Sequence, residues 1–439
     1  MPDDSRQPRL TLAALRRSAA MHGVLYERLS WTIAAAACVV LSIRIVRLVK
    51  FSGQDSWFPM SRALDVLHGS SPGDVYQALF FSGHVKFQYP PSGLLLLELL
   101  RRIGLDRSSE YNALNAGLMI ATGLVFSVFA TRILGPIRCL GLRFPVAPVA
   151  FFAGIRFYPT YTAFLFGQMQ VLLGLLFLLA CLSLVNDKRI VAGCLIAGAA
   201  SVKPQFLMLG LLALWRKDWR FLGGFAAVLA AAEISSVALY GWDTQLHYLQ
   251  VLKFLSHHGE QQHLNQSING ILNRYLYAGP SLDNDPENPI PGSAFPPYIP
   301  AVYAATTLST LIMIAIPFAL RVKEDDRVSR LLGFCTATVL FTMASPIAWV
   351  HHYNILLPAY VVGLKVVLDR WQTRRDPVAL IALAVSFVLT GFALAPPMDP
   401  TAPAHNLAQS HLFFGACLLV GVLLVEARSV PSGSPVRGS

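Results

Sequence analysis

The feature that most constrains the fold of this chain is a series of apolar segments separated by short stretches that carry Lys and Arg. A helix needs about 20 mostly apolar residues to cross a bilayer. Only 13% of the residues are charged, whereas soluble domains carry roughly 25%. The sequence therefore predicts an all-α, polytopic transmembrane helix bundle and excludes a soluble enzyme. The candidate segments lie near 30–48, 112–131, 144–160, 168–185, 220–240, 298–320, 331–346, 350–368, 377–396 and 409–427.

Two further apolar segments are irregular. The stretch 190–215 is long enough for two short helices, with a break at Lys203-Pro204, since proline cannot continue a helix in the ordinary way. The stretch 89–103 is too short to span and ends in two arginines. We expect it to be half-inserted or re-entrant.

The basic residues orient the bundle, because Lys and Arg favour the cytoplasmic side. With the N-terminus inside and about twelve crossings, most basic clusters fall inside. Two clusters do not: Arg44/Arg47/Lys50 and Arg101/Arg102/Arg107. The resulting division is a cytoplasmic arm (1–29), a transmembrane domain (30–427) with outer loops at 51–90 and 241–297, and a disordered tail (428–439). The net charge of +11 thus indicates membrane topology, with no nucleic-acid partner.

Several polar residues stand out in this apolar chain, and all fall on the predicted outer side. Each also has an ordinary structural interpretation: Asp55 as a loop acid or helix cap, Tyr89-Pro90-Pro91 as an interfacial anchor, Lys203 as a snorkelling side chain. Ionisable groups at membrane depth are nevertheless functional candidates. The set comprises Asp55, Tyr89, Gln168, Lys203, Asn265, Gln266, His351 and His352.

Other chemistries find little support. The paired His351-His352 could bind a metal only with further ligands, and no other His or Cys stands at clear ligand spacing. The six cysteines form no CxxC pair and are expected to be buried apolar residues. Phosphate-binding glycine loops and nucleophile elbows do not occur either. We therefore expect no cofactor, and the sequence does not indicate a divalent metal.

The order and spacing of these motifs carry a resemblance. Asp55, Asp74-Val75-Tyr76, Tyr89-Pro90-Pro91, Gly167-Gln168, Lys203-Pro204, Asn265-Gln266-Ser267 and Ser345-Pro346 through His352 follow one another from about residue 30 to about residue 358. In this the chain resembles glycosyltransferase family 87, the mannosyltransferase-like group of the polyprenyl-phosphate-sugar-dependent C superfamily. The resemblance implies a multi-helix bundle, a lipid-linked sugar donor, an outer active site and a catalytic aspartate in the first outer loop, where Asp55 stands.

The expected activity is transfer of a hexose, such as mannose, from a polyprenyl-phosphate donor to a hydroxyl of a glycan or glycolipid acceptor. The protein would lie in the plasma (inner) membrane, in contact with its lipid, with the active site on the outer or periplasmic side. Because one base suffices, the reaction should invert the anomeric centre. The expected roles are: base, Asp55; donor and phosphate binding, Lys203, His351, His352, Tyr89 and Gln168; acceptor binding, Asn265, Gln266 and Trp242.

Alternatives stay open at this point. A flippase or transporter for a lipid-linked glycan would also be polytopic, but it should show paired broken helices in both halves. An acyltransferase using His351 or His352 would leave the other motifs unexplained. Lys86 is a weaker candidate for the phosphate. The other outer acids that could act as the base are Asp65, Asp74, Glu98, Glu233, Asp283, Asp285 and Glu287.

Overall fold

The computed structural model describes residues 12–69, 74–139, 142–276, 295–323, 326–375, 377–394 and 407–429. The regular structure of these residues is helical, apart from one hairpin of two-residue strands, so the all-α prediction is confirmed. The predicted acids Asp283, Asp285 and Glu287, and the tail from residue 430, lie outside the described residues.

The elements follow in this order: α1 Leu12–Leu48, η1 Val49–Phe51, α2 Trp57–Leu67, η2 Gln77–Phe81, η3 Pro91–Leu94, α3 Leu95–Arg102, α4 Ser108–Leu134, β1 Arg138–Cys139, β2 Leu142–Arg143, α5 Val146–Arg156, α6 Tyr158–Leu165, α7 Gln170–Val185, α8 Arg189–Ala200, η4 Pro204–Phe206, α9 Leu207–Trp215, α10 Trp219–Tyr240, α11 Trp242–His258, α12 Ile268–Leu276, α13 Pro300–Ala319, α14 Arg327–Met343, η6 Val350–Ile355, α15 Leu356–Arg374, α16 Pro377–Gly391 and α18 His411–Ser429.

The chain is membrane-embedded. Five helical stretches in the described part are long and apolar enough to cross a bilayer, and five further apolar helices are shorter. The predicted number of about twelve crossings stays a prediction. Large apolar side chains cover the outside of several helices, as a lipid environment favours; Ile234 on α10, for example, is 70% exposed. The five long stretches are Arg28–Phe51, Ser108–Leu134, Trp219–Tyr240, Pro300–Ala319 and His411–Arg428.

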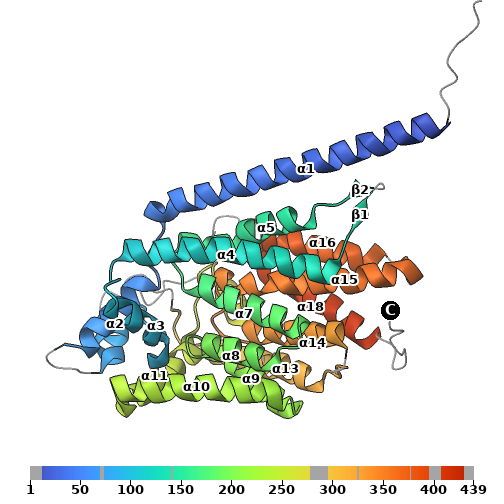
Figure 1. Cartoon of the computed structure of the whole chain (residues 1–439). Helices are drawn as coiled ribbons and strands as arrows, with labels where there is room; N and C mark the ends of the chain where they lie inside the picture. Colours follow the sequence, from blue (N-terminus) through green and yellow to red (C-terminus); the bar gives the residue numbers. More distant parts are fainter. Residues whose placement is uncertain are drawn as a thin grey trace, which may run out of the picture.

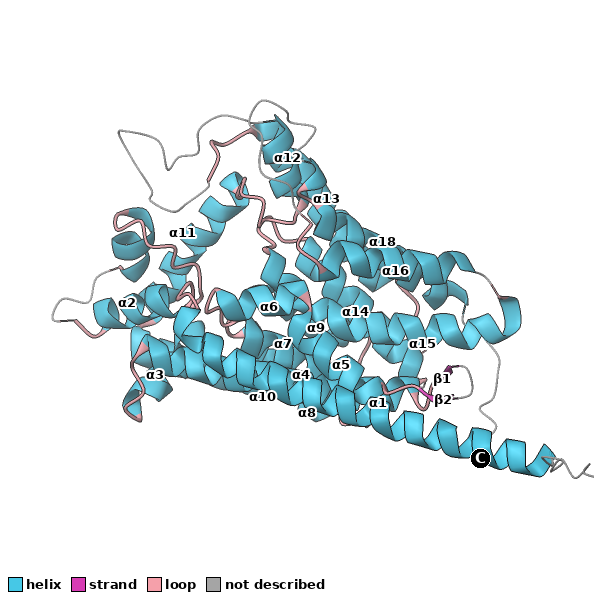
Figure 2. Cartoon of the chain, turned by 90° about the horizontal axis from the view of Figure 1, so that it is seen from above, coloured by secondary structure: helices cyan, strands magenta, loops and turns pink. Residues whose placement is uncertain are grey.

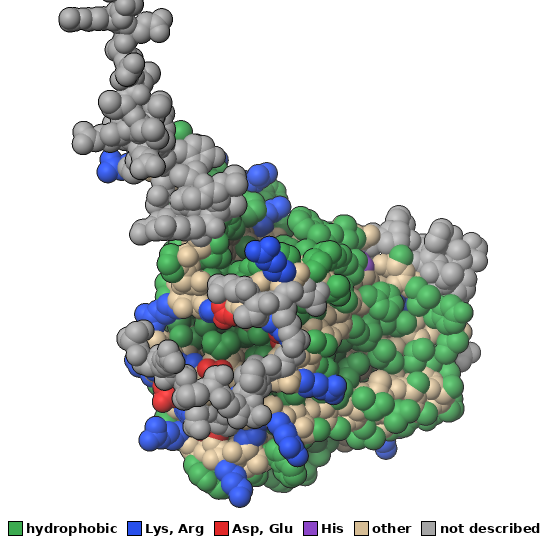
Figure 3. Space-filling view, turned by 90° about the vertical axis from the view of Figure 1, so that its right-hand side faces the viewer, with side chains coloured by type: hydrophobic (Ala, Val, Ile, Leu, Met, Phe, Trp, Pro, Cys, Tyr) green, Lys and Arg blue, Asp and Glu red, His purple; other side chains and the backbone are tan. Residues whose placement is uncertain are grey.

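The bundle has two distinct ends. The short elements α2, α3 and α11 gather at one end, and the β1–β2 hairpin lies at the other (Figures 1 and 2). Viewed toward the hairpin end, the surface shows Lys and Arg side chains beside a broad hydrophobic area (Figure 3). Asp187 there pairs with Arg330, 2.7 Å away, and with Arg189. We call the end with α2, α3 and α11 the α2–α11 end.

Small residues let the helices pack closely, as is common in membrane bundles. A Cβ on Gly193 of α8 would lie 2.0 Å from the carbonyl oxygen of Phe221, and one on Gly224 of α10 would lie 2.2 Å from that of Ile190. On the other side of the bundle, Gly123 of α4 and Gly154 of α5 face each other. These contacts hold α8 close to α10, and α4 close to α5.

Several helix boundaries differ from the predictions. The segment 144–160 is divided between two helices, because Phe157 is extended at ψ 124° and Pro159 stands in the first turn of the next helix, which begins at Tyr158. The break at Lys203-Pro204 is confirmed: α8 ends at Ala200 and Pro204 starts η4. The segment 89–103 is a short helix after Pro91, too short to span, as predicted.

Both segments predicted as outer loops contain helices. Between residues 51 and 90, α2 buries one face through Trp57, Met60 and Leu64. The segment 241–297 contains α11 and α12. Helix α1 continues without a break across residue 29, where the N-terminal arm was expected to end.

Candidate active site

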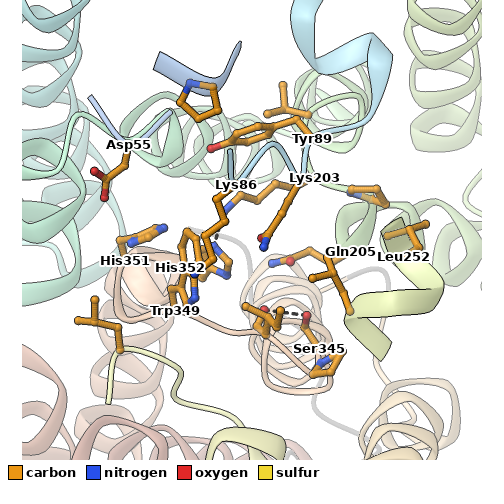
Figure 4. Close-up of a pocket in the computed structure, with 18 of the residues that line it drawn as sticks. Asp55, Lys86, Tyr89, Lys203, Gln205, Leu252, Ser345, Trp349, His351 and His352 are labelled. Atoms are coloured by element: carbon orange, nitrogen blue, oxygen red, sulfur yellow. Dashed lines mark hydrogen bonds between the residues drawn. The ribbon is translucent and has the colours of Figure 1, made fainter. Parts of the chain in front are cut away.

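A cavity of about 810 Å³ lies at the α2–α11 end (Figure 4). Four stretches far apart in the sequence supply its polar lining, and α11 closes one side with Tyr248, Leu252 and Leu255. These stretches contribute the polar residues Gln54, Asp55, His84, Lys86, Gln88, Tyr89, Lys203, Gln205, Ser345, Trp349, His351 and His352, and the segment that contains α11 adds Ser256 and Gln262.

Asp55 sits in the short connection between η1 and α2. This connection is held by the loop that follows α6: Gly53 N donates to Leu165 O at 2.7 Å, and Asp55 N donates to Phe166 O at 3.0 Å. Two segments more than 100 residues apart in the chain therefore fix the position of the Asp55 backbone.

The Gly167-Gln168 motif explains how this contact forms. Gly167 has φ +63°, and a Cβ there would lie 2.0 Å from the carbonyl oxygen of Gly53. Gln168 then donates through Nε2 to Asp55 Oδ2 at 3.3 Å. Its Oε1 accepts from Ser56 Oγ at 2.8 Å, so the amide orientation is set. The Gly167-Gln168 motif therefore positions the Asp55 carboxylate, and Gln168 itself stays outside the cavity lining.

Replacing Gly167 tests this arrangement. Gly167→Ala is expected to lower transferase turnover strongly, because alanine disfavours positive φ and its Cβ would collide with Gly53. Gly117→Ala is the matched control, since a Cβ on that glycine of α4 meets nothing within 4 Å. Turnover of both variants should be compared at equal amounts of folded protein. Equal activity of the two variants would contradict the positioning role.

Tyr89 belongs to the same support. Its hydroxyl lies 2.6 Å from Ser56 Oγ, and its carbonyl accepts from Tyr76 at 2.8 Å. Pro90 and Pro91 direct the chain into η3 immediately afterwards. Tyr89 lines the cavity, whereas Gln168 lies behind Asp55. Both residues therefore belong to the hydrogen-bond network that holds Asp55 and Ser56.

Part of the lining is basic, and we call Lys203, His351 and His352 the basic wall. Lys203 precedes η4, and its Nζ is in hydrogen-bond contact with His352 Nε2. Figure 4 shows Lys203, His351 and His352 around one part of the cavity. Two buried imidazole nitrogens, His351 Nε2 and His352 Nδ1, have no hydrogen-bond partner among the described residues. Within the same residues Lys203 contacts no carboxylate, so its amino group can bond an anion that enters the cavity.

Lys86 is a second lysine of the cavity, and its partner Glu260 was not expected from the sequence. Lys86 Nζ lies 2.7 Å from Glu260 Oε1 and 5.0 Å from the ring centroid of Trp349. Glu260 is fully buried and also accepts a hydrogen bond from Trp349 Nε1. The sequence does not distinguish Glu260 from other acids in polar segments, because its partners Trp349 and Lys86 are 89 and 174 positions away in the chain.

The residues predicted to bind the acceptor do not line the cavity. Asn265 bonds Glu260 O, Pro346 O and Ala348 N, so it ties two segments together. Gln266 is buried against Gln409 O and Phe413 N. Trp242 is 63% exposed at the start of α11. The same segment instead reaches the cavity through Tyr248, Leu252, Leu255, Ser256, Gln262 and Leu264.

Asp55 is the one carboxylate that lines the cavity within the described part of the chain. Three of the other candidate acids have partners elsewhere. Asp65 pairs with Arg101 at 2.9 Å, Asp74 with His247 at 3.3 Å, and Glu98 with His68 at 2.8 Å. Glu233, on α10, does not reach the cavity.

The environment of Asp55 alters its acidity. Loss of bulk water around the carboxylate raises its pKa above that of an ordinary aspartate. The hydrogen bond from Gln168 and the charge of Lys86 lower the pKa and offset part of this effect. The cavity thus combines one carboxylate of raised pKa with a basic wall.

No group of three or more His, Cys, Asp or Glu residues stands where it could hold a metal ion, as far as the described residues extend. His351 and His352 have ring centroids 4.8 Å apart, and the neighbour of His352 is Lys203, a cation.

Comparison with curated proteins found no match. The model of glycosyltransferase family 87 matches residues 87–346, which is more than half of the chain. The match includes Tyr89, Gln168, Lys203 and Asn265, whereas Asp55 precedes it and His351 and His352 follow it. The chain therefore belongs to glycosyltransferase family 87, a family of membrane glycosyltransferases of the C type.

Proposed function

We propose that this glycosyltransferase moves a hexose, with mannose as the first candidate, from a polyprenyl phosphate to a hydroxyl of a glycan or glycolipid acceptor. The observation that carries the proposal is the composition of the cavity: among the described residues its lining holds one carboxylate, a lysine that contacts no carboxylate, and two histidines. The reaction needs a base at one end and an anion site at the other.

The basic wall suits the leaving group. As the glycosidic bond breaks, its electron pair goes to the phosphate oxygen, and negative charge grows there. Cations and hydrogen-bond donors placed beforehand stabilise this charge most in the transition state. Lys203 supplies a charge, and the free nitrogens of His351 and His352 can bond phosphate oxygens. Lys86 is positioned to assist from the same cavity.

Asp55 suits the base. The acceptor oxygen forms a bond to the anomeric carbon, its proton passes to the Asp55 carboxylate, and polyprenyl phosphate leaves. Direct displacement of this kind inverts the anomeric centre and needs no second carboxylate as a covalent nucleophile. This agrees with the single carboxylate of the described lining.

The proposed location follows from the donor. A polyprenyl tail is too apolar for water, so the site must be reached from the bilayer. The apolar side chains of Phe58, Leu252 and Leu255 lie in the same lining as the polar groups. We place the cavity on the outer side of the plasma membrane, on the basis of the positions of the basic clusters.

The proposal is tested with purified protein in detergent and a panel of polyprenyl-phosphate sugars. We expect sugar transfer to the acceptor with release of equal amounts of polyprenyl phosphate, and mannose to be the best donor sugar. The Asp55→Asn protein is the control for release by contaminants. Movement of the donor across vesicle bilayers without release of polyprenyl phosphate would instead identify a flippase.

The raised pKa of Asp55 predicts the pH dependence. Only the ionised carboxylate can accept the proton, so activity should be present above this pKa and lost as pH falls through it. The acidic limb of kcat/KM should lie above the pH at which an ordinary aspartate titrates. In Gln168→Leu it should move to still higher pH, because a bond that favours the ionised form is lost. A limb at or below the ordinary aspartate pKa in both proteins would contradict the assignment.

A further inference from the structure

A second cavity of about 880 Å³ lies beside the first, between the end of α1 and the start of α4. Arg44 and Arg47 from α1 and Lys50 from η1 line it, together with Ser108 and Ser109 from the first turn of α4. We call it the α1–α4 cleft. These three cations are one of the two basic clusters whose place on the outer side opposes the usual charge bias, so they need an explanation of their own.

The charge of this cleft is not neutralised. No carboxylate lines it, and no carboxylate pairs with Arg44, Arg47 or Lys50 among the residues that the structure describes. The other exceptional cluster differs. Its Arg101 pairs with Asp65, and its Arg102 pairs with Glu98. Glu110 is close in sequence to the cleft serines, but its carboxylate accepts hydrogen bonds from the backbone N–H groups of residues 106 and 107.

Apolar surface adjoins the cations along α1. Val39, Val40, Ile43 and Val46 are all exposed, with Val40 64% exposed. The three cations lie in the last part of the span Arg28–Phe51, and headgroup phosphates lie at the ends of membrane spans. A ligand that places an anion in the cleft can therefore lay a hydrocarbon chain along the same helix. A free anion would use only the cations.

We propose that the α1–α4 cleft binds an anionic phospholipid of the surrounding bilayer, with the headgroup phosphate on Arg44, Arg47 and Lys50. The guanidinium groups can form paired hydrogen bonds with phosphate oxygens, and the serine hydroxyls can add further bonds. The acyl chains lie on the exposed apolar face of α1. This phospholipid is neither the sugar donor nor the acceptor.

The bound lipid acts on the Asp55 loop, which is the connection between η1 and α2. Its effect on catalysis rests on the proposed function. Gln54 lines both cavities. Its Oε1 accepts a hydrogen bond from Ser108 Oγ at 2.9 Å. Asn112, also in the cleft, donates to the carbonyls of Ser52 and Gly53 at 3.3 and 3.2 Å. A headgroup in the cleft therefore orders the segment that presents Asp55.

Binding is tested without reference to the reaction. The protein is placed in nanodiscs of phosphatidylcholine with and without phosphatidylglycerol, and retained lipids are counted by native mass spectrometry. Wild type should retain one phosphatidylglycerol selectively. Combined Arg44→Gln, Arg47→Gln and Lys50→Gln should bind it roughly 100-fold more weakly, since each cation near an anionic surface strengthens binding about fivefold. The matched control is Lys217→Gln, Arg220→Gln and Arg327→Gln, which removes three exposed cations elsewhere and should bind like wild type.

Inorganic phosphate and polyprenyl phosphate are the competing ligands. Neither should displace the retained phosphatidylglycerol at equal concentration. Displacement by inorganic phosphate would show a free-anion site, and displacement by polyprenyl phosphate would show a donor site; either result overturns the proposal. Equal retention of phosphatidylglycerol by wild type and the triple variant would also overturn it.

Activity measurements distinguish the proposed lipid site from the proposed transferase function. Phosphatidylglycerol should raise kcat several-fold in wild type and in the control triple variant, with donor KM unchanged, and should leave the cleft variant unaffected. If lipid binding is seen but no sugar is transferred by any protein, the proposed function fails and the lipid site stands. If transfer occurs without any dependence on phosphatidylglycerol, the coupling to the Asp55 loop is wrong.

Discussion

Asp55→Asn is expected to fold normally, to bind the lipid donor, and to lose almost all sugar transfer, with turnover falling on the order of 10²- to 10⁴-fold. The amide keeps the size of the side chain, but it cannot accept the proton of the acceptor hydroxyl. Asp55 is the one carboxylate in the described lining, so no neighbouring acid is available to replace it. The measurement is single-turnover transfer with purified protein, together with donor binding.

The matched control is Asp65→Asn. Asp65 lies on α2, close to Asp55 in the sequence, but it points to Arg101 and stays outside the cavity. An exposed ion pair of this kind contributes little to stability, so activity should remain near that of wild type. If Asp55→Asn kept more than roughly a tenth of wild-type turnover, that loss would be smaller than a general base allows. The base would then have to be sought at Asp74 or another outer acid.

Lys203→Met is expected to lower kcat on the order of 10²-fold, with a smaller effect on donor KM. Methionine retains the apolar length of the side chain and removes the amino group, with its charge and its contact with His352. Because negative charge grows on the phosphate as the bond breaks, the lost interaction matters more in the transition state than in the bound donor. Comparing kcat with donor KM, and measuring the thermal midpoint of each protein, separates these contributions.

Lys253→Met is the control for Lys203→Met. Lys253 is an exposed lysine of α11 that does not line the cavity, so its replacement should leave kcat and donor KM unchanged. A lower thermal midpoint of Lys203→Met at full specific activity of the folded fraction would return Lys203 to a structural role. An equal loss in both variants would point to an effect of net charge on lipid binding.

The bundle itself could be predicted from local properties. Apolar length indicated the spans, and proline marked the break that the structure confirms between α8 and η4. Predictions were less successful where tertiary contacts overrode apolar length. The segment 144–160 divides at Phe157, and α2 forms inside a segment predicted as a loop, because its buried face packs on the rest of the molecule.

The polar motifs show the same limit. Asn265 and Gln266 look like sugar-binding residues in the sequence, since amides suit hydroxyl groups. In the structure their amides bond to backbone groups of residues 260, 346, 348, 409 and 413. An amide that bonds to buried backbone groups stabilises the fold at its position. Hydropathy and spacing in the sequence cannot distinguish this role from ligand binding.

The sequence by itself determined that the chain is an all-α membrane bundle and which polar residue types it holds, because transfer of apolar side chains into lipid and the missing N–H of proline act on each segment locally. Only the tertiary structure decided which polar residues meet. Gly53 bonds Leu165, and Lys203 contacts His352 across 149 positions of the chain. Such meetings depend on how helices pack, and helix packing is a property of the whole bundle. The surroundings of the Asp55 carboxylate, the basic wall and the α1–α4 cleft therefore appear only when the chain is folded.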